Sequence, residues 1–160
     1  MVMNIKLKPF LKQLFIPLAV GTVAGFLNRN ATKQFNETAV QPAFAPPAWL
    51  FPVVWTVLYI LMGVSAYIVE ENAPRTNLRT SAFAVYYLQL FFNFLWTFIF
   101  FMFNAYFFAF IWIIILWLLI IVMITLFYKI QPMAGILQIP YFLWVSFATV
   151  LNFAIYRLNR

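Results

Sequence analysis

The sequence contains no cysteine, no histidine and no aspartate among its 160 residues. Without cysteine there is no disulfide, no CxxC redox pair and no thiolate metal site. Without histidine there is no Ser-His-Asp or Cys-His nucleophile system and no histidine metal cluster. These absences exclude the usual polar enzymes, and we expect no bound metal.

Charged residues are also scarce. They make up 8% of the chain and hydrophobic residues 66%, against about 25% and 45–50% in soluble domains. The acidic residues are Glu37, Glu70 and Glu71, all at the borders of apolar segments. Paired intramembrane carboxylates for acid–base catalysis are therefore absent. A proton-coupled transporter is disfavoured because it usually keeps an ionisable residue within its spans. The composition predicts an integral membrane protein.

The charged residues divide the chain into long uncharged runs. The run between Arg79 and Lys129 holds two spans, since one span needs about 20 apolar residues, and three other runs hold one each. Runs such as IIILWLLIIVMI lack the alternation of a membrane β-strand. The sequence thus predicts an all-α, five-transmembrane-helix bundle forming a single domain, 1–160. The expected spans are residues 10–28, 48–69, 80–102, 105–128 and 133–156.

The net charge of +7 would suggest nucleic acid as the partner of a soluble protein. Here the ten basic residues lie almost entirely at span ends, where they serve as topology and headgroup anchors. We therefore expect the lipid bilayer, and no nucleic acid, as the partner. An odd number of spans places the termini on opposite sides. No extension rich in Arg and Ser precedes the first span, which favours a bacterial cell membrane.

The segment from Pro42 to Tyr67 runs from a proline-rich loop into an uncharged helical segment with regularly spaced rings. Phe51, Trp55, Tyr59 and Met62 follow at i, i+4, i+8 and i+11, so they share one helix face. Such a face forms an aromatic wall that suits flat ligands. The connection before it, 29–47, is much longer than the usual 2–8 residues between bundle helices. We interpret it as a lid over one end of the bundle.

The third and fifth spans carry stripes of polar and aromatic residues. In the third span the stripe is Tyr86, Gln89, Asn93, Trp96 and Phe100. In the fifth span it is Tyr141, Trp144, Ala148 and Asn152, where the small alanine leaves room beside the tryptophan. The amides either hydrogen-bond helices together or line a pocket. Tryptophans either anchor at the headgroups, as Trp49 does in one interpretation, or line a cavity, as we expect of Trp55, Trp96 and Trp144.

The first span contains Gly21 and Gly25, a small-xxx-small pair that lets another helix approach closely. The approaching helix belongs either to the same bundle or to a second copy of the chain. Packing within the bundle and a homodimer are both compatible with this pattern.

These motifs resemble the TspO/MBR family, the tryptophan-rich sensory proteins or translocator proteins, once called peripheral-type benzodiazepine receptors. The resemblance covers spans two, three and five in order. It rests on Pro42, Pro46-Pro47-Ala48-Trp49, Val54-Trp55, Leu58-Tyr59, Met62-Gly63, Tyr67, Gln89-Leu90, Asn93, Trp96, Phe100-Phe101, Pro140-Tyr141, Trp144, Phe147-Ala148-Thr149 and Leu151-Asn152.

The resemblance implies a five-helix membrane protein that binds porphyrins such as protoporphyrin IX, sterols, and synthetic benzodiazepine-type ligands. It also implies a pocket covered by the first loop. The residues that match the family pocket are Pro42, Trp55, Tyr59, Gln89, Asn93, Trp144 and Ala148. The chain departs from the family in the loop, where Phe44 and Phe35 stand at positions that usually carry Trp or Tyr.

The leading hypothesis is a receptor or sensor that stacks a tetrapyrrole among its rings, with Phe44 contributing from the lid and Arg29 or Lys33 pairing with the propionates. No cofactor is required, and without His or Cys the metal-free macrocycle is favoured over haem. The second hypothesis is enzymatic, a light-dependent breakdown of porphyrin in which Trp55 or Trp144 takes part. The third is a transporter of tetrapyrroles or sterols.

Overall fold

The described part of the chain, residues 6–74 and 76–160 of a computed structural model, folds into helices. Five helical segments are long and apolar enough to cross a membrane. The predicted all-α, five-span architecture is therefore confirmed. In chain order the elements are α1 Leu7–Thr38, α2 Leu50–Asn72, α3 Asn77–Thr97, the π-helical turn η1 Phe98–Met102, α4 Tyr106–Ile130, α5 Pro132–Ile136 and α6 Ile139–Leu158.

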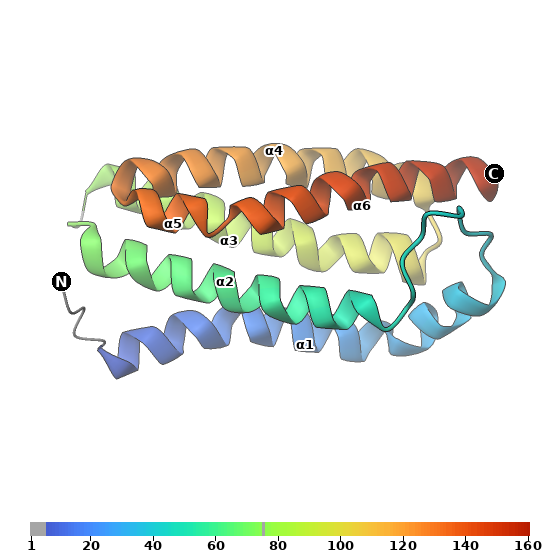
Figure 1. Cartoon of the computed structure of the whole chain (residues 1–160), viewed down its shortest axis with the longest axis horizontal. Coiled ribbons are helices and arrows are strands. Elements are labelled where there is room, and N and C mark those ends of the chain that lie inside the picture. Colours follow the sequence, from blue (N-terminus) through green and yellow to red (C-terminus); the bar gives the residue numbers. More distant parts are fainter. Residues whose placement is uncertain (1–5, 75) are drawn as a thin grey trace.

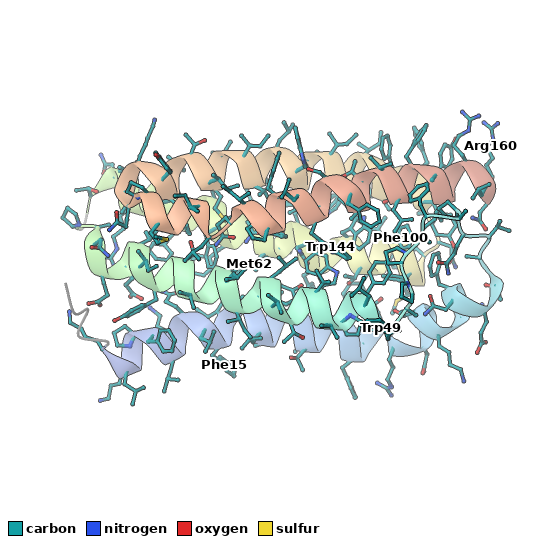
Figure 2. The ribbon with its side chains drawn as sticks, viewed as in Figure 1. Phe15, Trp49, Met62, Phe100, Trp144 and Arg160 are labelled. Atoms are coloured by element: carbon teal, nitrogen blue, oxygen red, sulfur yellow. The ribbon has the colours of Figure 1, made fainter. Side chains whose placement is uncertain are left out.

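The helices run up and down along one elongated bundle (Figure 1). Helix α1 contacts α2 and α3, and α4 contacts α3 and α6. The short helix α5 contacts α2. The start of α1 and the end of α6 lie at opposite ends of the bundle (Figure 1). The interior is apolar and contains residues such as Met62, whereas Phe15 points outward from α1 (Figure 2).

The first helix is longer than the expected span 10–28, and the predicted loop 29–47 is correspondingly shorter. Residues 29–38 continue α1, because no glycine or proline interrupts the sequence between Gly25 and Pro42. The buried ring of Phe35 anchors this extension against Phe100, at 5.2 Å between ring centroids, and Phe101, at 5.3 Å. The actual connection is residues 39–49.

Two of the spans contain local breaks. The fifth span is divided into α5 and α6, because Pro140 lacks an N–H and its ring conflicts with the carbonyl four residues earlier, at Ile136. The third span ends in the π-turn η1, where the Phe103 N–H donates to the Phe98 carbonyl at 3.0 Å. Asn104 follows with φ of 51°, a left-handed conformation that asparagine tolerates.

A cluster of charged groups joins α1, α2 and α3 at the end of the bundle where α1 begins. The Glu70 carboxylate accepts from the Gln13 amide at 2.7 Å and pairs with Lys12 at 3.3 Å and Arg79 at 3.8 Å. Lys6 pairs with Glu71 at 2.8 Å, and this hydrogen bond raises the pKa of the Lys6 ammonium group. The charges at this end therefore bind the helices to one another.

Next to this cluster, α2 is packed tightly on both sides. A Cβ on Gly63 would lie 2.7 Å from the Leu14 Cα, so α1 and α2 meet here backbone to backbone. On the other side the Ser65 hydroxyl donates to the Ala134 carbonyl of α5 at 2.6 Å. The N-terminal half of α2 borders a cavity instead of packing closely on its neighbours.

We predict that Gly63→Ala destabilises the bundle by about 1–3 kcal/mol, the usual cost of overpacking a tight contact. The added methyl would push against backbone, which cannot move aside as a flexible side chain does. Thermal unfolding in detergent measures the effect. The matched control is Gly25→Ala, whose methyl meets no atom within 4 Å. Equal melting temperatures for the two variants would contradict the close approach.

Candidate ligand-binding cavity

A cavity of about 550 Å³ lies among α1, α2, α3 and α6, in the half of the bundle covered by the connection 39–49. Its volume falls within the roughly 300–1,000 Å³ typical of small-molecule sites. Aromatic and aliphatic side chains form most of its wall. Such a lining suits a hydrophobic ligand with few polar groups.

The structure brings six of the nine predicted ligand-binding residues to the cavity wall: Trp55, Tyr59, Asn93, Trp96, Trp144 and Ala148. The remaining three, Pro42, Phe44 and Gln89, are not part of this lining. The Phe44 ring packs on Phe147 at 6.4 Å between centroids and stays half exposed. Gln89 is fully buried beyond the cavity floor. Ligand contact by the six wall residues stays a prediction.

Arg29 and Lys33, the predicted partners of the propionates, are also outside the cavity lining. The Arg29 guanidinium donates to the Phe26 carbonyl at 2.9 Å and lies 4.1 Å from the centre of the Phe26 ring. Lys33 is 3.9 Å from Glu37, one turn further along α1. Both residues are exposed on the helical extension of α1, next to the polar cavity residues Asn28 and Thr32.

Rings of α2 and α6 pack on one another and form a continuous aromatic wall of the cavity. Phe51 on α2 contacts Trp144 on α6 edge to face, at 5.7 Å between centroids. Trp55 lies 5.5 Å from Tyr59 and 6.1 Å from Tyr141 of α6. Figure 2 shows Trp144 between α6 and α2. The aromatic ladder predicted on the second span thus forms one wall of the cavity together with rings of α6.

A chain of hydrogen bonds forms the floor of the cavity. The Tyr59 hydroxyl donates to Asn93 Oδ1 at 3.0 Å, and Asn93 Nδ2 donates to the Tyr141 hydroxyl at 3.0 Å. Tyr141 in turn donates to Gln89 Oε1 at 2.8 Å. All four side chains are buried, and they join α2, α3 and α6. Asn93 therefore both links helices and lines the cavity, whereas Gln89 links helices only.

A second polar link fixes the wall beside Phe100. The Trp96 indole N–H donates to Asn152 Oδ1 at 3.1 Å, and Asn152 Nδ2 donates to the Tyr106 carbonyl at 2.9 Å. The Trp96 ring also stacks on Phe100, with centroids 5.0 Å apart. Its N–H already has a partner, so Trp96 offers a ligand its ring face and not a donor.

Sequence reasoning missed the contribution of α1 to the cavity. The missed lining residues on this helix include Thr22, Gly25, Asn28, Thr32 and Asn36. Four of them, from Gly25 onward, are spaced by three, four and four residues, which is a helical stripe. The expectation that the helix ends at residue 28 hid this signal, because a loop has no stripe.

A sequence model for the TspO/MBR family matches residues 13–157. The chain belongs to the TspO/MBR family. It is 38% identical to Protein CrtK of Rhodobacter capsulatus over 77% of both chains. It is 37% identical to the tryptophan-rich protein TspO of Archaeoglobus fulgidus, over 89% of this chain and 91% of that one. Identity to the human translocator protein is 30%, over 75% and 72%.

Family membership confirms the resemblance drawn from the motifs of spans two, three and five. Together with the five spans it identifies a multi-pass integral membrane protein of the sensory and translocator class. The bilayer is accordingly its surroundings. The matched region begins within α1 and ends within α6, so it contains all the elements that surround the cavity.

We predict that Tyr141→Phe destabilises this TspO/MBR protein by about 1–3 kcal/mol, because it leaves Asn93 Nδ2 and Gln89 Oε1 buried without a partner. Tyr59→Phe removes one bond of the chain and should cost less. Unfolding in mixed detergent measures both. Tyr87→Phe is the control, since Tyr87 is 42% exposed on the outer face of α3. A loss no greater than that of the control would show that the network does not hold the bundle.

Proposed function

We propose that this TspO/MBR protein is a receptor-like membrane protein that binds a metal-free tetrapyrrole, such as protoporphyrin IX, in the cavity. The single observation that carries the proposal is the continuous aromatic wall that α2 and α6 form beside a space of about 550 Å³. A flat macrocycle can lie against Trp55 and Trp144, because aromatic rings favour stacked and edge-to-face contacts. Other flat or rigid hydrophobic molecules, including sterols, fit the same lining.

The cavity has polar side chains at its floor, where Asn93 already has hydrogen-bond partners, and at the end covered by the connection 39–49, where Asn36 and Gln41 lie. A porphyrin with two propionates on one edge fits with that edge at the covered end. Arg29 and Lys33 are exposed near that end, and they pair with the propionates by exchanging their present partners, the Phe26 carbonyl and Glu37.

The residues around the cavity favour the metal-free macrocycle over haem. Haem iron is usually held by His, Cys, Met or Tyr, and the sequence contains neither His nor Cys. Tyr59 is the tyrosine on the wall, and its hydroxyl already donates to Asn93 at 3.0 Å. Binding by stacking requires no axial ligand.

Titration with protoporphyrin IX tests the proposal through quenching of tryptophan fluorescence in the purified protein. We expect saturable quenching, and a dissociation constant raised about three- to tenfold in Trp144→Phe, as the loss of one aromatic contact implies. The control is Trp112→Phe, because Trp112 stacks on Phe92 at 4.3 Å outside the cavity. Quenching that does not saturate, or that both variants weaken equally, would reject the site.

Light-dependent oxidation of the bound porphyrin is the second candidate function, and the arrangement of oxidisable rings around Trp55 favours it. Tyr59 and Tyr141 both contact this indole, and the hydrogen-bond chain through Asn93 connects their hydroxyls. Illuminated porphyrin is a photosensitiser, so with dioxygen as the oxidant a neighbouring indole can exchange an electron with it. Trp55 is then the residue that reacts.

Illumination of the aerobic complex distinguishes binding from oxidation. If the protein is an enzyme, a new bilin-like absorbance band should appear in the wild type and be lost in Trp55→Phe, which keeps a ring but is harder to oxidise. Trp112→Phe should retain the band. Bleaching identical to that of free porphyrin would leave binding as the function.

A further inference from the structure

The cavity opens sideways between α1 and α2, in addition to its polar end. Of the lining residues that are exposed on the surface, three lie at the polar end: Asn36, Gln41 and Ala48. The other five are Thr22, Gly25 and Phe26 on α1, and Pro52 and Thr56 on α2. Thr22 lies three positions before Gly25 and four before Phe26, and Pro52 lies four before Thr56, so these five residues follow the facing edges of the two helices. Residues exposed on the outside that also line an interior space mark an opening.

The opening exists because α1 and α2 separate along their length. They are in backbone contact at Gly63, where a Cβ would lie 2.7 Å from Leu14. At Gly21 they still touch, because a Cβ there would overlap the Tyr59 ring. One turn later a Cβ on Gly25 would meet no atom within 4 Å, so α2 does not pack against this position. The small-xxx-small pair thus has one glycine in the contact and one at the opening.

Apolar side chains lie beside this opening. On α1 the exposed neighbours are Val23 and Leu27, each about half exposed. On α2 the half-exposed Val53 and Val57 belong to a separate groove towards Pro140 and Leu143 of α6. In a membrane protein such a surface faces acyl chains and not water. The Thr56 hydroxyl donates to the Pro52 carbonyl at 2.7 Å, so it is satisfied within its own helix and does not require water.

The two openings of the cavity therefore differ in chemistry. The end opening has Asn36 and Gln41 in its lining and lies under the connection 39–49, which two hydrogen bonds between Val40 and Asn159 hold in place. The lateral opening has an apolar rim and no covering segment among the described residues. A molecule dissolved in the hydrocarbon layer meets the lateral opening directly.

We propose that the gap at Gly25 is a portal through which hydrophobic ligands enter the cavity from the acyl-chain region of the bilayer. The identity of the ligand rests on the proposed function, but the existence of the portal does not. Ligands are then selected first by partition into the membrane and second by fit to the aromatic wall. An amphiphilic ring system enters this way while its polar edge stays near the headgroups.

Thiol accessibility tests the portal without any assumption about the ligand. The chain has no cysteine, so Ala148→Cys introduces a single thiol on the cavity wall. In nanodiscs it is reacted in parallel with a lipid-soluble maleimide and with a charged, membrane-impermeant methanethiosulfonate. Adding Gly25→Leu should slow the reaction with the maleimide about tenfold. The new side chain narrows the portal, and raising the barrier to passage by a free energy similar to the cost of overpacking gives a slowing of this size. The rate of the charged reagent should stay unchanged.

The control variant is Val23→Leu, which enlarges an exposed side chain on α1 that is not part of the cavity lining. It should change neither rate. Gly25→Leu should fold, because a Cβ there has open space and leucine is a better helix former than glycine. An unchanged melting temperature verifies this.

An unchanged maleimide rate in Gly25→Leu overturns the portal, and so does equal slowing of both reagents, which would mean that leucine only fills the cavity. Porphyrin kinetics give a second measurement. If the portal is the route, Gly25→Leu slows both association and dissociation of the porphyrin, whereas a leucine that only fills the cavity weakens binding without slowing dissociation. If wild type shows no saturable porphyrin quenching while the thiol result holds, the proposed function fails and the portal stands.

Discussion

The close approach of α1 and α2 at Gly63 is the constraint on which the rest of the structure depends. Because there is no side chain at this position, the two backbones touch beside the Ser65 contact to α5, and α2 is fixed at one end. A helix fixed at one end and separated from its neighbours at the other necessarily encloses a tapering space. The cavity, its aromatic wall and its lateral opening all follow from that taper.

The buried polar side chains beside the cavity join helices to one another without carrying a formal charge. The Tyr59–Asn93–Tyr141–Gln89 chain joins three helices without a formal charge, and the charged groups gather at the end of the bundle around Glu70. The Tyr59 and Tyr141 hydroxyls and the Asn93 amide in this chain are all paired with other side chains, as hydrocarbon surroundings require. The same residues that stabilise the bundle thus set the floor of the cavity.

The sequence was sufficient to predict the five spans and the aromatic and amide residues that α2, α3 and α6 contribute to the cavity wall, because both depend on periodicity. Uncharged runs separate the spans, and three- and four-residue spacing placed Trp55, Tyr59, Asn93 and Trp144 on facing stripes. The end of α1 was not predicted, since the polar composition of residues 29–38 resembles a loop while Phe35 holds them in a helix by distant contacts.

The positions of the loop residues could not be predicted for a related reason. Nothing in the local pattern around Pro42 and Phe44 indicates that the connection is tied to the far end of the chain. The pair of hydrogen bonds between Val40 and Asn159 spans 119 positions in the sequence. The segment over the polar opening is consequently held by Asn159, which directly follows α6. A displacement of this helix end would move the cover of the cavity as well, although Asn159 is not part of the cavity lining.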